Sequence, residues 1–411
     1  MNRKMRVAMI GHKRIPSREG GVEIVVEELG SRMTQAGIEV VAYNRSGHHV
    51  AGKENEDLQS TKQKYYKGIR LITVPTSQKK SLNAVIYSFF AAIRAAFGRY
   101  DVIHFHAEGP AFMQFIPKLF GKKVVTTIHG LDWQRAKWGG FGSAFLKAGE
   151  KMAARKSDAI IVLSQNMQQY FKDTYNRDTI CLPNGVDKPE THEPEIITQK
   201  YGLQGEDYIL FLARLVPEKG LDYLLDAYDN LVSRDDRTKN WRLVIAGGSS
   251  HTDEYMEAIT EKVAALNRKY QYRNEYRMKN NTMNLQNPSY KKQIIMTGFV
   301  QGQELEELYS NASLYVLPSD IEGMPLSLLE ALSYGNVCLV SDIPENMEVI
   351  DDHAYHFKKS DVEDLTNQLS TIFNSDKPER REIQEFILNK YNWDDITKET
   401  LEVYEGVRKK G

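Results

Sequence analysis

Cysteine is almost absent from this chain: its 411 residues include only Cys181 and Cys338. Two cysteines are too few for the disulfide framework of a small secreted scaffold, or for a zinc site built from cysteine ligands. Both lie in apolar, strand-like surroundings. We therefore expect buried, unreactive thiols in a protein from a reducing compartment.

Long hydrophobic runs are also missing. No run reaches the roughly 18–20 apolar residues that a membrane-spanning helix needs. The nearest, Leu82 to Phe97, contains Asn83 and Arg94 and has basic residues on both sides. That pattern fits a helix lying in a membrane interface, and it also fits a helix packed on its own sheet. Because residues 1–6 lead directly into an apolar strand, no signal peptide is predicted. We expect a cytoplasmic protein that can sit on the inner face of the plasma membrane.

The net charge of −1 hides an asymmetry between the two halves of the chain. Residues 1–190 contain 29 Lys and Arg against 17 Asp and Glu, whereas residues 191–411 contain 25 against 38. A basic half predicts contact with an anionic surface. Attraction between the two halves would explain the same asymmetry.

The order of apolar segments predicts an α/β fold. The chain is too long for one ordinary core, and short apolar runs alternate with helical patterns, as in βαβ units with parallel sheets. Strands are predicted at Arg6–Ile10, Glu39–Tyr43, Ile69–Val74, Val102–His106, Val124–Ile128, Ala159–Leu163, Tyr208–Ala213, Arg242–Ala246, Gln293–Thr297, Leu314–Leu317 and Val337–Ser341. Helices are predicted between them, for example at Glu23–Ala36, Leu82–Phe97 and Gly142–Lys156. Two doubly wound domains follow.

The boundary between these domains is predicted near residues 188–194, where proline and acidic residues interrupt the pattern. The first domain is then 1–190 and the second 191–390, and residues 391–411 form a further helix. The segment 267–292 is rich in Tyr, Asn, Lys and Arg and has little apolar periodicity. It is predicted to be an insertion, either an extended helix or a flap.

Two carboxylates, Glu322 and Glu330, are the most informative residues. On a helix an offset of eight places two side chains on roughly one face. The turn between the strand at 314–317 and the following helix contributes Gly323, Met324, Pro325 and Leu326. Free N–H groups and the positive dipole end of that helix form an anion site. The combination suits a ligand with phosphate and hydroxyl groups, such as a sugar nucleotide, although an ordinary amphipathic helix would give a similar pattern.

Arg214 and Lys219 follow the first strand of the second half. Ligands of open α/β sheets bind at this end of the strands. An Arg can contact two oxygens of a diphosphate while a Lys supplies a compact charge. A solvated loop is the alternative.

In the first half, Gly20 and Gly21 precede a helix and would let the backbone approach a phosphate, unless they are ordinary turn glycines. Arg14 and Arg18 in the same loop suit an anionic acceptor or the donor phosphate.

His106 and His129 each end a strand, and His129 is followed closely by Asp132 and Trp133. This aromatic and charged stretch suits a sugar face or a lipid-phosphate headgroup. An isolated His at such a place is also often a simple loop residue.

Taken in order, these segments resemble the retaining, nucleotide-sugar-dependent glycosyltransferases of family 4. The resemblance rests on Gly20-Gly21, Thr127-Ile-His129-Gly130, Leu182-Pro-Asn-Gly-Val-Asp187, Arg214-Leu-Val-Pro-Glu-Lys219-Gly220, Ile245-Ala-Gly-Gly248, Gly298-Phe-Val300 and the Glu322-x7-Glu330 element. It implies the GT-B fold, in which two Rossmann-like domains face a deep cleft. It also implies that the last helix crosses back to the first domain.

The resemblance also implies roles for the residues. Glu330 would bind the ribose hydroxyls, and Glu322 and His129 would lie at the transferred sugar and serve catalysis. Arg214 and Lys219 would hold the diphosphate, and Gly298 and Val300 would border the nucleobase. The remaining donor contacts are Gly21, Gly323, Met324, Pro325 and Leu326, and the acceptor contacts are Arg14, Arg18, Gly20, His106, Asp132 and Trp133. No Asp-x-Asp metal motif is found, so we expect no metal and no cofactor.

The N-terminal segments Gly11–Pro16 and Gly20–Glu23 are most similar to the rhamnosyltransferase-like subgroup of bacterial polysaccharide biosynthesis. The expected donor is dTDP-rhamnose or a UDP-sugar, and the expected acceptor is lipid-linked or a glycan, as in capsule synthesis. No nucleic acid partner is expected.

Three alternatives stay open. The first is a soluble enzyme that makes a small glycoside or a sugar phosphate. The second is a sugar-binding protein without catalysis. The third is a dinucleotide oxidoreductase, which is disfavoured because Gly11 is followed by His12 and Lys13 instead of a G-x-G-x-x-G motif.

Overall fold

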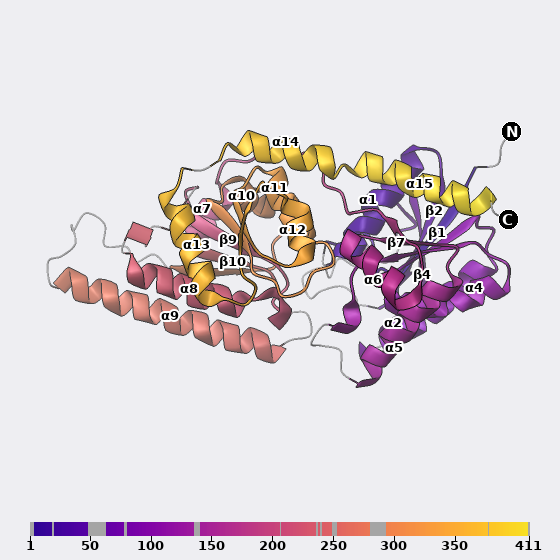
Figure 1. Cartoon of the computed structure of the whole chain (residues 1–411), viewed down its shortest axis with the longest axis horizontal. Coiled ribbons are helices and arrows are strands. Elements are labelled where there is room, and N and C mark those ends of the chain that lie inside the picture. The colour runs from indigo at the N-terminus through magenta and orange to yellow at the C-terminus, as the bar shows by residue number, and fades with distance from the viewer. Residues whose placement is uncertain are drawn as a thin grey trace. The chain divides into compact units, whose positions relative to one another are not determined.

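The computed structural model describes residues 4–18, 20–47, 63–77, 80–134, 140–205, 207–235, 237–238, 241–248, 253–279, 293–376 and 378–409. The chain divides into two compact units (Figure 1). Unit 1 consists of Met1–Gly185 together with Tyr391–Gly411, and unit 2 is Val186–Lys390. Each unit is built around its own sheet.

The sheet of unit 1 has the strand order β3-β4-β2-β1-β5-β6-β7-β8. Its strands are β1 Arg6–Ile10, β2 Glu39–Arg45, β3 Tyr65–Tyr66, β4 Ile69–Val74, β5 Val102–His106, β6 Val124–Ile128, β7 Ala159–Val162 and β8 Ile180–Cys181. Among the strands that the structure describes in this sheet, only β3 and β4 pair antiparallel. Central strands such as β5 and β6 are buried along their whole length, as expected for a parallel sheet covered on both faces.

The helices of unit 1 are α1 Gly21–Gln35, α2 Lys80–Ala96, α3 Glu108–Ala111, α4 Phe115–Leu119, α5 Gly140–Lys156, α6 Gln165–Tyr175 and α15 Trp393–Lys409. The inner face of α2 presents Tyr87, Ala91 and Ala95 to the core beside β1 and β5. Ser164 caps α6 by accepting a hydrogen bond from the Met167 N–H at 3.2 Å. The apolar face of α2 is thus buried against the sheet.

The last helix, α15, packs in unit 1 although it follows unit 2 in the sequence. Arg32 of α1 forms an ion pair with Asp394 at 2.8 Å. The Tyr404 hydroxyl lies 2.6 Å from Nδ1 of His104 on β5. Tyr404 has no exposed surface, so α15 is part of the core of unit 1.

The described strands of unit 2 form a parallel sheet with the order β11-β10-β9-β12-β13-β14. Its strands are β9 Tyr208–Leu212, β10 Arg242–Ala246, β11 Ile294–Gly298, β12 Leu314–Leu317, β13 Cys338–Ser341 and β14 Tyr355–Phe357. Its helices are α7 Ile196–Tyr201, α8 Leu221–Arg234, α9 Asp253–Lys279, α10 Gln303–Ser310, α11 Leu326–Ser333, α12 Pro344–Ile350, α13 Val362–Asn374 and α14 Arg380–Lys390. The predicted α/β class is confirmed in both units.

Three strands were not predicted: β3, β8 and β14, each of two or three residues. Such segments are too short to show a periodic pattern. For the predicted insertion at 267–292, the structure gives a helix up to Lys279, because α9 continues through it, and the rest of the segment lies outside the described residues.

Candidate active site

Unit 2 has a topological switch point between β9 and β12. From β9 the chain moves outward to β10 and β11, and it then returns to the other side of β9 with β12. At such a point the loops after the two strands diverge and leave a crevice at the carboxyl edge of the sheet. The loops after β9 and β12 contain Arg214, Lys219 and Glu322.

A glycine brings these two loops into contact. Gly220 has a φ of +67°, and a Cβ there would lie 2.0 Å from the carbonyl oxygen of Pro318. Next to this contact the Asp320 N–H donates to the Glu218 carbonyl at 2.9 Å. Only glycine permits this approach without displacement of the backbone. The loop after β9 is thereby held against the end of β12.

Lys219 donates a hydrogen bond to Oε1 of Glu322 and forms an ion pair with it. The Lys219 side chain is 13% exposed and the Glu322 side chain 7%. A buried charge of either sign would be costly alone, so the pair holds both residues at the switch point. Arg214 is half-buried in the same loop as Lys219.

The prediction that helical periodicity places Glu322 and Glu330 on one face is wrong. Helix α11 begins at Leu326 with Pro325 as its N-cap, so Glu322 belongs to the preceding loop. Pro325 therefore loses no helical donor, and Leu326 is the first residue whose N–H lies inside the helix. The proline fixes the helix start because its own φ is restricted and the residue before it is held in an extended conformation.

Glu330 lies in α11 and is half-buried. Its Oε2 accepts a hydrogen bond from the Tyr309 hydroxyl at 3.0 Å. The Tyr309 ring in turn stacks on Tyr334 at 5.3 Å between centroids. These contacts fix the direction of the Glu330 carboxylate.

The ends of β10 and β11 complete this edge of the sheet. The Gly247 N–H donates to the Gly298 carbonyl at 2.8 Å. A Cβ on Gly247 would lie 1.8 Å from the carbonyl oxygen of Ala213. Gly298 has a φ of +76°, and Val300 just after it is 9% exposed. The ends of four strands thus lie along one edge of the sheet of unit 2. Glu322 lies in the loop after β12 and Glu330 in the helix that follows that loop.

Unit 1 has its own switch point, between β1 and β5. Gly11 directly follows β1 and lies against His106, since a Cβ on Gly11 would lie 2.1 Å from the His106 carbonyl oxygen. His106 Nδ1 lies 3.1 Å from Nε2 of His129. The prediction that His106 contacts an acceptor is wrong for this structure, because its side chain has no exposed surface. His129 follows β6 and is half-buried.

The glycine loop before α1 already has a carboxylate beside it. Glu23 is 5% exposed and accepts a hydrogen bond from the Lys13 N–H at 2.6 Å. A Cβ on Gly20 would lie 2.3 Å from Glu23 Oε2. An anion near Gly20 and Gly21 would therefore meet this negative charge, which the sequence prediction did not take into account.

The two arginines of this loop are engaged within unit 1. Arg14 is 7% exposed, and its guanidinium donates to the Gly47 carbonyl at 3.1 Å. Arg18 lies 3.4 Å from Glu28 and 3.6 Å from Glu27, both on α1. Arg18 remains partly exposed, whereas Arg14 has little surface to offer to an acceptor.

Asp132 and Trp133 are held by two buried glutamates that the sequence analysis missed. The Asp132 N–H donates to Glu108 Oε2 at 3.1 Å, and the Trp133 indole N–H donates to Glu150 Oε2 at 2.9 Å. Lys147 Nζ lies 4.1 Å from the centroid of the Trp133 ring. Burial, reinforced by the charge of Asp132, raises the pKa of Glu108 to about 10. The segment after His129 therefore rests on a neutral Glu108.

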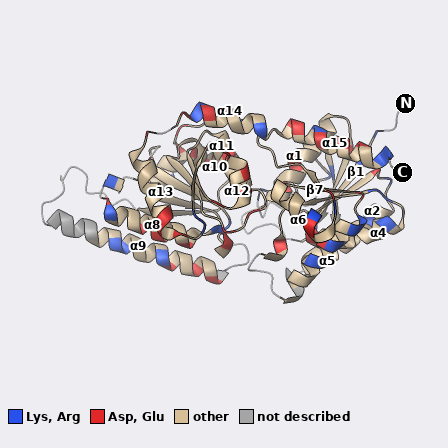
Figure 2. Ribbon diagram, in the orientation of Figure 1, with Lys and Arg blue, Asp and Glu red and all other residues tan. Residues whose placement is uncertain are grey.

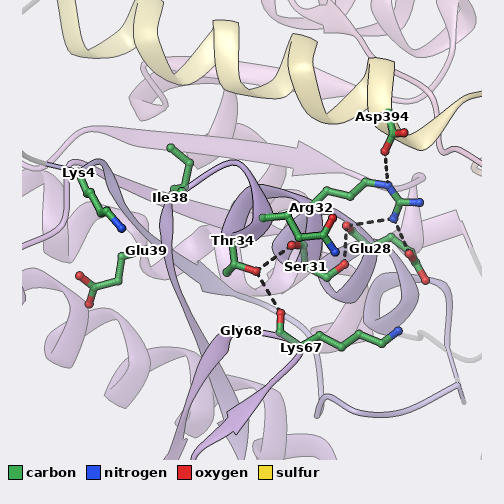
Figure 3. A pocket seen from close by; sticks show the side chains of 12 residues that line it. Lys4, Glu28, Ser31, Arg32, Thr34, Ile38, Glu39, Lys67, Gly68 and Asp394 are labelled. Atoms are coloured by element: carbon green, nitrogen blue, oxygen red, sulfur yellow. Dashed lines mark hydrogen bonds and ion pairs between the residues drawn. The ribbon is translucent and has the colours of Figure 1, made fainter.

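A pocket of about 900 Å³ lies elsewhere in unit 1, near the amino ends of β1 and β2 (Figure 3). Arg32 extends across it and binds Glu28 and Asp394. These ion pairs join α1 to α15. The pocket is lined by none of the candidate site residues, so it is separate from the candidate site. Among the described residues, no group of three or more His, Cys, Asp or Glu side chains could hold a metal ion.

Comparisons with known proteins cover nearly the whole chain. The model of Glycosyltransferase Family 4 matches residues 19–189, and that of Glycosyl transferases group 1 matches residues 194–389. Together they support a family 4 GT-B glycosyltransferase.

Two relatives with similar sequences are themselves named as glycosyltransferases. An uncharacterized glycosyltransferase of Methanocaldococcus jannaschii is 26% identical over 74% of this chain and 75% of its own. The UDP-Gal:alpha-D-GlcNAc-diphosphoundecaprenol alpha-1,3-galactosyltransferase of Escherichia coli is 24% identical over 67% of this chain and 66% of its own.

Among solved structures, sucrose-phosphate synthase from Thermosynechococcus elongatus superposes with a TM-score of 0.76 at 17% identity, over the full length of both chains. This likeness establishes the fold of the glycosyltransferase, which is GT-B. It leaves the donor and the acceptor to be inferred from the site.

Proposed function

We propose that this glycosyltransferase moves a sugar from a nucleotide-diphosphate sugar to a lipid-linked or glycan acceptor in cell-surface polysaccharide biosynthesis, with retention of the anomeric configuration. The observation that carries the proposal is the Lys219–Glu322 pair at the switch point of unit 2, with Arg214 in the same loop. It combines cations for a diphosphate with a carboxylate for sugar hydroxyls. Glu330, fixed by Tyr309, is the proposed ribose contact.

The proposed reaction breaks the bond between the anomeric carbon and the diphosphate oxygen. A bond from the acceptor oxygen to the same carbon forms on the same face, and the acceptor proton passes to the departing phosphate. Negative charge grows on that phosphate, so Arg214, Lys219 and the N-terminal N–H groups of α11 would stabilise the transition state. His129 is proposed to contact the transferred sugar. Because Arg214 and Lys219 would face the diphosphate, we propose that transfer needs no metal.

The name of the Escherichia coli relative supports the kind of substrates. That enzyme is described as using UDP-Gal and a diphosphoundecaprenol-linked sugar. We propose a UDP-sugar or dTDP-rhamnose as donor for this chain. The rhamnosyltransferase-like subgroup stays part of the proposal because of the sequence around Gly11–Pro16.

A surface of unit 1 supports peripheral contact with an anionic membrane. Phe90 and Arg94 of α2 are spaced i, i+4, so they share one face, and both are exposed, as is Phe97 directly after the helix. Phe97 lies against Phe120, with 4.9 Å between ring centroids, and Leu119 beside it is 79% exposed. Exposed aromatic and aliphatic side chains of this kind suit insertion between headgroups.

Basic residues are exposed on a helix that packs beside α4. Helix α4 packs against both α2 and α5, and α5 exposes Lys147, Lys151 and Arg155 at successive i, i+4 positions. Lys and Arg are prominent along α5 in Figure 2. Unit 1 as a whole carries 32 Lys and Arg against 20 Asp and Glu. We call the exposed residues Phe90, Arg94, Phe97, Leu119, Phe120, Lys147, Lys151 and Arg155 the docking surface. Among the described residues, no helix is long and apolar enough to span a membrane.

The function is tested by assaying purified protein with a panel of UDP-, GDP- and dTDP-sugars. One series of assays would use a polyprenyl-diphosphate-linked sugar in detergent, and the other would use hexose phosphates. Transfer to the lipid-linked acceptor, with the donor anomer kept in the product, supports the proposal. Transfer to a hexose phosphate alone would favour the soluble enzyme, and no transfer from any donor would contradict both.

A further inference from the structure

Three histidines form a column at the switch point of unit 1. His104 and His106 are two residues apart on β5, so their side chains lie on the same face of the sheet. Their ring centroids are 4.1 Å apart, and the His106 and His129 rings stack at 5.4 Å. His104 and His106 have no exposed surface.

The first member of the column, His104, is fixed from both ends. Its Nδ1 lies 2.6 Å from the Tyr404 hydroxyl of α15, and its Nε2 lies 2.7 Å from the Thr127 hydroxyl of β6. Both ring nitrogens therefore have partners, and either tautomer satisfies them. Burial lowers the pKa of His104 to about 3, so the ring stays neutral.

The second member, His106, has a single hydrogen-bond partner among the described residues. Its Nδ1 faces Nε2 of His129 at 3.1 Å, and its own Nε2 is buried without a partner. Burial also lowers the pKa of His106 well below its ordinary value. A neutral His106 can leave either an N–H or a lone pair unpaired at Nε2. A buried N–H without an acceptor is the rarer and costlier case.

The favoured tautomer of His106 carries its proton on Nδ1 and donates it to His129. Nε2 of His129 is then an acceptor, and the proton of a neutral His129 is on Nδ1. This hydrogen bond favours the Nδ1-protonated tautomer of His129 and directs its Nε2 towards His106.

We propose that His106 is a positioning residue that fixes the tautomer of His129, and that Tyr404 of the C-terminal helix holds His106 in place through His104. The inference rests on the proposed role of His129 at the transferred sugar. It makes the docking of α15 a requirement for an ordered His129.

Asn and Gln in place of His106 give a matched test. The Asn side-chain amide lies near the place of histidine Nδ1, whereas the Gln amide lies near Nε2. His106→Asn should therefore keep the bond to His129, and His106→Gln should lose it. The first readout is the tautomer of His129, from nitrogen NMR shifts of ¹⁵N-histidine-labelled full-length protein, assigned with His129→Gln.

We expect Nδ1-protonated His129 in the wild type and in His106→Asn, and a shift towards the Nε2-protonated form in His106→Gln. In the transfer assay, His106→Gln should lower kcat about 10-fold to 100-fold, as misplacement of a contact residue does, with a smaller change in the donor KM. Tyr404→Phe, which removes only the hydroxyl, should shift the same NMR signal and lower kcat less. In a His129→Ala background it should have no further effect on kcat.

The two readouts separate this inference from the proposed function. If the tautomer of His129 is the same in His106→Gln as in the wild type, the positioning role is wrong whatever the activity. If the tautomer shifts but wild-type protein transfers no sugar, the proposed function fails and the hydrogen-bond assignment stands. Should His106→Gln not fold, Tyr404→Phe decides: an unchanged His129 signal and a kcat loss that persists without His129 would overturn the proposal.

Discussion

Lys219 and Glu322 are bound to each other in unit 2, although they follow different strands and lie 103 residues apart in the chain. Sequence reasoning gave them separate partners, the diphosphate for Lys219 and the sugar for Glu322. Because of this ion pair, a phosphate group that enters the site either replaces Glu322 as the partner of Lys219 or binds Lys219 together with it. The charge of Lys219 is therefore balanced before any ligand binds.

The pair leads to opposite expectations for its two members. Lys219→Ala should nearly abolish transfer and weaken nucleoside diphosphate binding about 10-fold to 100-fold, as loss of a charged hydrogen bond of roughly 1.5–3 kcal/mol would. Glu322→Ala should lower kcat strongly but leave that affinity equal or higher, because Lys219 keeps its charge. Calorimetric titration with UDP and dTDP, alongside kinetics, measures both. Similar losses of affinity in the two variants would disprove the separate roles.

Glu330→Ala should weaken nucleoside diphosphate binding by about 10-fold or more, through loss of a carboxylate that is proposed to bind ribose hydroxyls. Tyr309→Phe is the matched control, because it removes only the hydroxyl that orients Glu330. Its effect should be smaller and in the same direction. Titration with a 2′,3′-dideoxynucleoside diphosphate, which lacks both ribose hydroxyls, should show no difference between wild type and Glu330→Ala, and a difference there would argue against the ribose contact.

Transfer should continue in excess EDTA. In the proposed site Arg214 and Lys219 supply the positive charge that a bound metal supplies in other enzymes. The check is the initial rate of sugar transfer with EDTA and then with added Mg²⁺. A rate that stops with EDTA and returns with Mg²⁺ would rule out the metal-independent scheme.

The docking surface should bind anionic vesicles reversibly at low salt. Each basic residue near such a surface contributes about 1 kcal/mol, and the attraction fades within a Debye length. Replacing Phe97, Leu119 and Phe120 with Ser should reduce cosedimentation with phosphatidylserine vesicles without unfolding the protein, since all three are exposed. Replacing Lys147, Lys151 and Arg155 with Gln should reduce it mainly at low salt.

The control for these variants is an exposed aromatic residue outside the docking surface, Tyr272 of unit 2, which is 71% exposed. Tyr272→Ser should bind vesicles as the wild type does. If wild-type protein ignores phosphatidylserine vesicles even at low salt, the membrane part of the proposal is wrong and the acceptor has to reach the enzyme in solution.

Glu108 gives the stability of unit 1 a pH dependence. Because the folded state raises its pKa to about 10, the contribution of protonated Glu108 is complete below about pH 4.5 and declines as the pH rises towards 10. Glu108→Gln keeps a neutral side chain at every pH. Its free energy of unfolding relative to wild type should therefore increase from pH 5 to pH 9, by at most about 1.4 kcal/mol per pH unit.

Urea unfolding at pH 5, 7 and 9 measures this difference. Glu402→Gln on the exposed side of α15 is the control, and its difference from wild type should vary little with pH. A constant difference between Glu108→Gln and wild type across that range would show that Glu108 is not held protonated by its surroundings.

The strands were predictable where burial on both faces produces a continuous apolar run, as in Leu314–Leu317. The position of the site residues in the loops after these strands was also predictable, because the carboxyl ends of parallel strands share one edge of the sheet. The start of α11 was also predictable, because Pro325 in the turn after β12 signals a helix start at the following residue. The helical spacing of Glu322 and Glu330 did not apply, because Glu322 precedes that turn.

Contacts between distant segments could not be predicted. Glu150 accepts hydrogen bonds from Trp133, Tyr170 and Tyr175, and nothing in their spacing along the chain indicates a shared partner. The burial of His106 depends on a central strand being covered on both faces, and its neighbour His104 is held by Tyr404, 300 residues away. Sequence patterns report local periodicity, whereas these contacts follow from the packing of the whole unit.

The packing of Gly185 against Trp393 has a consequence for synthesis of the protein. A Cβ on Gly185 would lie 2.6 Å from the indole, so the points where the chain leaves and re-enters unit 1 are adjacent. Unit 2 is one uninterrupted stretch and can fold as soon as it emerges from the ribosome. Unit 1 must wait for residues 391–409, because Tyr404 and Trp393 fill its core. Against the usual N-to-C order of folding, the domain that is translated first is completed last.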